Sequence, residues 1–107
     1  MKQETQSALL NAFISWGEKL RTKHGHEVKI EIEVGPPYVK QGVSINFNDK
    51  REIGTISVWN SAEYEIYFQS IYGDEVSNFH YGEAIEPEQF EQLFSPVTFR
   101  YFNRPRS

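Results

Sequence analysis

The sequence predicts an α+β fold: an antiparallel meander of four to five strands with an N-terminal and a short C-terminal helix packed on one face. The hydrophobic period is helical near both ends of the chain and two residues between them. Ile and Val together outnumber Leu by 16 to 4, and β-branched residues favour strands. The connections between the apolar runs are short, so neighbouring strands should be antiparallel. The length of 107 residues suits a single domain over 1–107.

Residues 4–23 are expected to form the first helix. Their apolar side chains recur at helical spacing and place one stripe along the helix: Leu9, Phe13, Trp16 and Leu20, widened by Leu10 and Ile14. Gly17 weakens the interior of this helix. Gly25 marks its C-terminal end, because glycine readily adopts the conformation that terminates a helix.

The sheet is expected over about 27–82. Apolar and charged residues alternate from Val28 to Val34, which predicts a half-buried strand that Gly35 and Pro36 end. Further strands are predicted at 43–48, 52–59 and 64–69, with a weaker one at 76–81, and turns at 48–51, 60–62 and 72–74. In the third and fourth strands Ile56, Val58, Ile66 and Phe68 are even-numbered, so the odd-numbered side chains should face solvent.

A short second helix is expected at about 87–94. Pro87 suits a first helical position, and Phe90, Leu93 and Phe94 form one apolar face. The Ser95–Pro96 pair is expected to stop this helix. The remaining residues then form a basic tail at 100–107 that either caps the core or frays.

Composition limits the classes of function. The chain has no cysteine, which excludes disulfides, thiolate metal ligands and thiol nucleophiles. Its N-terminal residues lack the apolar run of a signal peptide, and it contains no stretch of eighteen apolar residues. We therefore expect a cytoplasmic protein with no membrane segment.

Negative charge is concentrated in one part of the chain. Residues 52–99 contain no Lys or Arg but nine acids: Glu52, Glu63, Glu65, Asp74, Glu75, Glu83, Glu86, Glu88 and Glu91. A field of this sign repels nucleic acid and attracts basic partners. Two interpretations stay open, namely a surface that only keeps the chain soluble and a surface directed at a partner.

We expect no metal site and no cofactor. His24 and His26 are the only close pair of histidines, and no further residue completes the ligand spacing of a structural zinc site. We therefore predict that the two histidines lie in a solvated loop. The seven glycines are scattered at turns, so there is no glycine-rich phosphate loop.

We expect no catalytic residues either. Ser70, Asp74 and His80 could form a Ser-His-Asp triad, but such triples arise by chance in a chain of this length. A structural, hydrogen-bonded role for His80 is the simpler interpretation. Glu31 and Glu33 share one side of a strand, where alternating charge indicates a solvated face rather than acid–base chemistry.

A partner-binding surface is the remaining candidate, on the side of the sheet opposite the helices or at its strand-end turns. Its predicted members are acids and amphipathic rings: Trp59, Glu63, Glu65, Tyr67, Tyr72, Asp74 and Glu75. Trp59 and Tyr67 are the expected anchors, with Glu65 as a charge contact. The alternatives are that Trp59 belongs to the core, and that the basic tail or the loop at 35–42 forms the interface.

Four segments carry a resemblance to a known family: VKIEIEVGP at 28–36, IGTISVW at 53–59, YGDEV at 72–76 and PEQFEQLF at 87–94. In these segments the chain resembles the TriTu family of bacterial immunity proteins. The resemblance implies an antitoxin to an Rhs-type or related toxin whose domain ADP-ribosylates elongation factor Tu. Such a protein binds and neutralises its cognate toxin without catalysis or cofactor. The resemblance assigns no contact residues.

Two other functions remain open from the sequence. One is an acidic adaptor, or a nucleic-acid mimic that inhibits another toxin such as a nuclease. The other is a hydrolase that uses His80 with a carboxylate. If the protein is an immunity protein, the expected partner is the ADP-ribosyltransferase domain of a polymorphic toxin, with neither nucleic acid nor membrane as a partner.

Overall fold

The computed structural model describes residues 8–36, 40–50, 52–70 and 76–102, with the backbone alone for 70, 76–79 and 100. A helix, five strands and three short helical segments follow one another along the chain. They are α1 (Ala8–His24), β1 (Lys29–Val34), β2 (Gly42–Asn48), β3 (Glu52–Trp59), β4 (Tyr64–Ser70), β5 (Val76–Gly82), η1 (Pro87–Gln89), α2 (Phe90–Leu93) and α3 (Ser95–Phe102).

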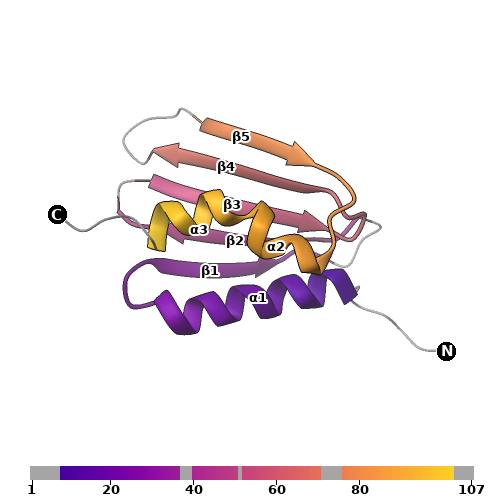
Figure 1. Ribbon diagram of the computed structural model, residues 1–107, viewed down its shortest axis with the longest axis horizontal. Helices are drawn as coiled ribbons and strands as arrows, with labels where there is room; N and C mark the ends of the chain where they lie inside the picture. The colour runs from indigo at the N-terminus through magenta and orange to yellow at the C-terminus, as the bar shows by residue number, and fades with distance from the viewer. Residues whose placement is uncertain (1–7, 37–39, 51, 71–75, 103–107) are drawn as a thin grey trace.

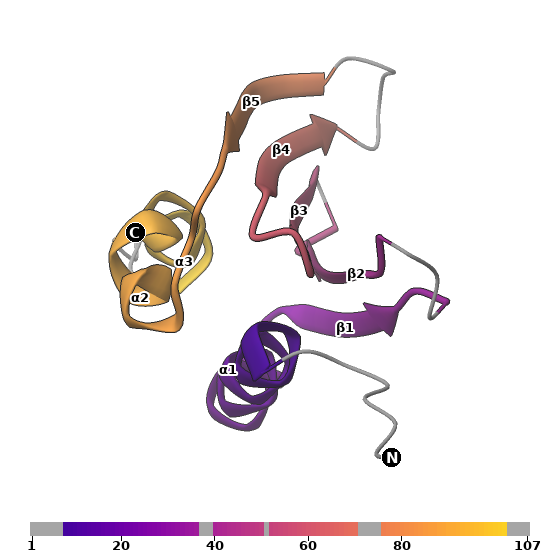
Figure 2. The same ribbon diagram turned by 90° about the vertical axis from the view of Figure 1, so that its right-hand side faces the viewer.

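The five strands form one antiparallel sheet in the order β1-β2-β3-β4-β5, which confirms the predicted meander and α+β class. In Figure 1, α2 and α3 cross in front of the sheet while α1 runs along β1, so the helices cover one face. Seen end-on, the sheet curves, and α2 and α3 lie on its concave side (Figure 2). The tight turns after β2 and β3 contain Lys50 and Ala62, which have positive φ angles of 79° and 72°.

The core lies between the helices and three rows of side chains that cross the sheet. Residues opposite one another in an antiparallel pair point to the same face. The strand register therefore places three apolar rows on one face: Val43–Val58–Tyr64, Ile45–Ile56–Ile66 and Phe47–Gly54–Phe68. The helical elements bury seven large side chains against these rows: Leu10, Phe13, Trp16, Phe90, Phe94, Val97 and Tyr101. The predicted even-numbered apolar set is thus confirmed.

The buried stripe of α1 is centred differently from the prediction. Leu10, Phe13 and Gly17 are buried, whereas Leu9 and Leu20 are only half-buried. Gly17 explains the shift, because a Cβ at this position would lie 2.6 Å from Ile45 Cδ1. The glycine lets α1 approach β2 closely, and the helix turns this side toward the sheet. Residues 4–7 of the predicted helix lie outside the described residues.

The predicted second helix does end before Ser95, since α2 ends at Leu93, but the prediction missed a further helix that begins there. Ser95 begins α3, because proline is tolerated in the first turn, where its missing N–H costs no helical hydrogen bond. Val97 and Tyr101 of this helix are buried, and the Tyr101 ring stacks on Phe47 at 5.6 Å. Residues 100–102 of the predicted basic tail therefore belong to α3, and 103–107 lie outside the described residues.

Val34 also departs from the prediction of an apolar buried face on the first strand. Its side chain is 47% exposed, whereas Ile30 on the same strand is buried. Val34 is the last residue of β1, an edge strand with a neighbour on one side only. Among the described helices, none has both the length and the apolar character needed to cross a membrane.

The packing of the C-terminal helices can be tested by comparing a buried and an exposed phenylalanine of this segment. Phe94 is fully buried against Phe13 and Trp16, whereas Phe99 in α3 is 60% exposed. Phe94→Ala should lower the free energy of unfolding by about 3–5 kcal/mol, while Phe99→Ala should change it by less than about 0.5 kcal/mol. Urea unfolding measures both values. Equal losses in the two variants would contradict this arrangement of α2 and α3.

Candidate functional site

The face of the sheet opposite the helices is the candidate site, and it is called the open face below. The strand register brings its side chains together from all five strands. Its residues are Glu31, Glu33, Ser44, Asn46, Thr55, Ser57, Trp59, Glu65, Tyr67 and Tyr81. The alternation that buries the apolar rows places these polar and aromatic residues on the other side.

Small polar side chains that bond to one another form the centre of the open face. The hydroxyl groups of Ser44 and Ser57 lie 2.8 Å apart, and Thr55 Oγ1 donates to Asn46 Oδ1 at 2.9 Å. Thr55, expected among the solvent-facing residues, is buried because its neighbours on this face cover it. Small side chains therefore form the centre of the open face, and larger side chains surround them.

Trp59, Glu65 and Tyr67 are brought together on this face, as the sequence predicted. All three are half-buried, so Trp59 does not belong to the core. No side-chain hydrogen bond or ion pair involves Glu65 or Tyr67 within the described residues, which leaves both polar groups available to a partner. Whether they contact one stays a prediction. Tyr72, Asp74 and Glu75 lie outside the described residues.

Glu63 makes intramolecular contacts at the end of the sheet. Lys40 Nζ lies 2.5 Å from Glu63 Oε1, Ser61 Oγ donates to the same oxygen at 2.6 Å, and the Tyr81 hydroxyl donates to Oε2. The contacts to Lys40, Ser61 and Tyr81, in that order, lower the pKa of Glu63 from 4.5 to about 2. The same carboxylate raises the pKa of Tyr81, because it accepts the phenolic proton in a hydrogen bond. This group, the Glu63 brace, holds Lys40 beside Trp59.

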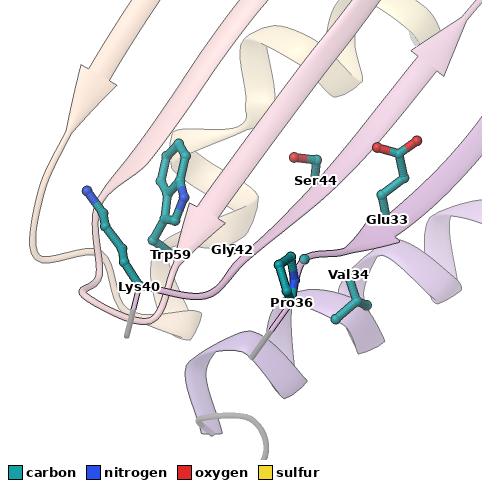
Figure 3. A pocket seen from close by; sticks show the side chains of 8 residues that line it. Glu33, Val34, Pro36, Lys40, Gly42, Ser44 and Trp59 are labelled. Atoms are coloured by element: carbon teal, nitrogen blue, oxygen red, sulfur yellow. The ribbon is translucent and has the colours of Figure 1, made fainter. Parts of the chain in front are cut away.

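An open hollow of about 510 Å³ lies at this end of the open face, and sequence reasoning missed it. It is lined by Glu33, Val34, Gly35, Pro36, Lys40, Gly42, Ser44 and Trp59. Figure 3 shows Glu33 of β1 on one side of the hollow and the indole of Trp59 on the other, while the side chain of Val34 points away from Glu33.

The indole of Trp59 is fixed from two sides. Lys40 Nζ lies 5.4 Å from the ring centroid, within cation–π distance. Gly42 is the cross-strand partner of Trp59, and a Cβ on it would lie 2.7 Å from both Cδ1 and Nε1 of the ring. The ring thus rests on the bare backbone of β2. The sequence signal for this contact was a glycine opposite an aromatic residue, a pairing that sheets use at glycine positions.

The residues considered for catalysis or metal binding are placed elsewhere. His80 is exposed, and its Nε2 lies 3.3 Å from the Tyr64 hydroxyl, which agrees with a structural hydrogen bond. The side chains of Ser70 and Asp74 are outside the described ones. His24 ends α1 and stacks on Phe102 at 4.0 Å, so the prediction of a solvated loop was wrong for this residue. In the described ranges, no three His, Cys, Asp or Glu side chains gather as metal ligands.

No protein-family model matches the chain, and no curated protein or solved structure matches it either. What the open face can bind follows from its own chemistry. It offers the carboxylates of Glu33 and Glu65 without a cation among the described residues, together with the rings of Trp59 and Tyr67. Such a surface suits a protein partner that carries positive charge.

The Glu63 brace gives a pH dependence with a definite sign. Since the pKa of Glu63 is lower in the folded chain, the unfolded state binds more protons between about pH 4.5 and 2. The stability that the brace contributes is complete above this window and is lost as the pH falls through it. The difference in unfolding free energy between the wild type and Glu63→Gln should therefore shrink from pH 5 to pH 2.

Urea unfolding of both proteins at several pH values measures this difference. Glu33→Gln is the matched control, because it makes the same chemical change on the same face without a contact to Lys40. If the difference in unfolding free energy between the wild type and Glu63→Gln stays constant down to pH 2, the contacts of the Glu63 carboxylate do not stabilise the fold.

Proposed function

We propose that this protein is an immunity protein that binds a cognate ADP-ribosyltransferase toxin and neutralises it by covering its active site. The open face supplies the binding surface. The protein performs no chemistry in this role, and it acts in the cytoplasm, where elongation factor Tu is found. The partner is the toxin domain itself, with no cofactor, nucleic acid or membrane involved.

One observation carries the proposal: the open face holds carboxylates that no cation of the described chain neutralises. Lys29 pairs with Glu31 at 3.6 Å, and Lys40 pairs with Glu63. Glu33 and Glu65 have no such partner among the described residues. They stand in the same row on β1 and β4, three strand spacings or about 14 Å apart. A basic surface would gain charge pairs at both positions.

The aromatic residues on the same face support the proposal. Trp59 and Tyr67 come from adjacent strands and are half-buried, so a partner covering them removes apolar area from water without much loss of side-chain freedom. Hot-spot residues of protein interfaces are enriched in Trp and Tyr. Charge beside aromatic rings gives both fast association and slow dissociation.

The resemblance to the TriTu family also bears on this face. Its most specific segments are residues 32–36 and 53–59, which form the end of β1 with the two residues after it, and most of β3. Glu33, Val34, Gly35, Pro36 and Trp59 from these segments line the hollow. The segments that suggest the family therefore meet at the surface that we propose as the interface.

The direct test is an inhibition titration with the ADP-ribosyltransferase toxin domain encoded beside this gene. Modification of elongation factor Tu should stop at about one molecule of this protein per toxin domain, because a tight binder acts stoichiometrically. Co-expression should also restore growth of cells that produce the toxin domain. Full toxin activity at a large excess of this protein would overturn the proposal, as would inhibition of a nuclease partner in its place.

The interface can be located with paired variants. Trp59→Ala should weaken toxin binding by about thirtyfold or more, and Glu65→Arg should slow association and speed dissociation. Phe99→Ala removes an aromatic ring and Glu88→Arg reverses a charge at exposed positions of the helical layer, and both variants should bind normally. Circular dichroism checks folding, and surface plasmon resonance measures both rates. Normal binding by folded Trp59→Ala and Glu65→Arg would exclude the open face as the interface.

A further inference from the structure

The hollow beside Trp59 contains an acidic group that the chain itself does not use. Glu33 is exposed and makes no ion pair or hydrogen bond with any described residue. Glu31 lies two positions earlier on the same strand and pairs with Lys29. Among the described residues that line the hollow, Lys40 is the only cation, and it contacts Glu63 and the ring of Trp59. Glu33 is therefore free to pair with a cation that enters from outside.

The other wall of the hollow offers a hydrogen-bond donor. Nε1 of Trp59 lies over Gly42, on the side of the ring that faces Ser44 in Figure 3. This nitrogen is not fully buried, and it donates to no group within the described part of the chain. Trp16 differs, because its Nε1 donates to Glu91 Oε2 at 3.0 Å. The Trp59 donor is held in place by the contacts that fix its ring.

An apolar surface lies beside the carboxylate. Pro36 is exposed and lines the hollow, whereas Val34 is paired with Val43 and points its side chain to the helix-covered side of the sheet. A ligand that reaches Glu33 would therefore cover aliphatic carbon as well as a negative charge. Lysine and arginine side chains combine these needs, since they carry a cation at the end of an aliphatic stem.

We propose that the hollow is a subsite for one lysine or arginine side chain on a loop of the partner protein. The cation pairs with Glu33, its stem packs on Pro36, and a backbone carbonyl of the loop accepts from Trp59 Nε1. The inference rests on the proposed function in one respect, namely that the loop belongs to the toxin domain. Anionic ligands are disfavoured, because Glu33 repels them and Glu63 neutralises Lys40.

The subsite can be tested without the toxin. The probe is N-acetyl-arginine N′-methylamide, which contains the cation, the stem and the backbone carbonyls. The chain has two tryptophans, so its amide NMR spectrum contains two indole signals. At millimolar probe, the Trp59 indole signal should move while that of Trp16 stays in place as an internal control. The shift should be absent with the corresponding glutamate derivative.

Two charge reversals on one strand distinguish an ion pair between the probe and Glu33 from attraction of the probe to the overall negative charge of the protein. Glu33→Lys and Glu31→Lys change the net charge equally and stand on the same face of β1. The probe-induced shift of the Trp59 indole should disappear in Glu33→Lys and persist in Glu31→Lys. Equal shifts in the two variants, no shift in the wild type, or an equal response to the glutamate derivative would each overturn the subsite.

The same pair then connects the subsite to the toxin. Glu33→Lys should weaken binding of the toxin domain by about tenfold or more, and Glu31→Lys by no more than about threefold. Trp59→Phe keeps a ring but removes the donor, and should cost about three- to tenfold. One Lys→Glu or Arg→Glu substitution in the toxin domain should restore binding to Glu33→Lys.

These outcomes distinguish the two proposals. If the probe shifts the Trp59 indole but the toxin domain does not bind, the subsite stands and the proposed function fails. If the toxin domain binds, and Trp59→Ala and Glu65→Arg weaken it while Glu33→Lys and Glu31→Lys behave alike, the function stands and the subsite fails. Circular dichroism confirms folding of each variant, and Glu33→Gln is a milder substitute if Glu33→Lys does not fold.

Discussion

The burial of three apolar rows beneath the helices is the constraint on which the other features depend. Ile45, Ile56 and Ile66 come from adjacent strands and point to the same side, where Phe13 and Phe94 also pack. Because side chains alternate along a strand, a register slip of one residue would carry these isoleucines into water. The core therefore fixes the register, and the register fixes which residues share the opposite face.

This dependence explains what the sequence could predict. The period-two pattern identified the strands from Gly42 to Gly82 and assigned Trp59, Glu65 and Tyr67 to the correct face. Both inferences depend only on residues that are close to one another in the sequence. The bounds of β3 agree with the prediction, because its aliphatic and polar residues alternate between two clear turn signals.

The missed features depend on residues that are distant in the sequence. α3 is stabilised by the burial of Val97 and Tyr101 in the core. The local preference of a Ser-Pro pair contains no information about this distant packing. Glu63 was predicted as a contact, but its pairing with Lys40 joins the approach to β2 with the turn after β3. The hollow likewise needs the end of β1 and the end of β3 in one place. Local patterns predict which residues share a face of the sheet. Only the folded chain shows where that face is hollow.

The two faces of the sheet are held together by separate sets of contacts. On the open face, Ser44 bonds to Ser57 and Thr55 to Asn46, while the apolar rows lie on the other side of the same strands. Glu33, Glu65 and Tyr67 lie on the face opposite the apolar rows, so substitutions at these positions should leave the core unchanged. The surface that we propose for recognition can therefore vary in sequence without a change of the core, so that one scaffold could serve different partners.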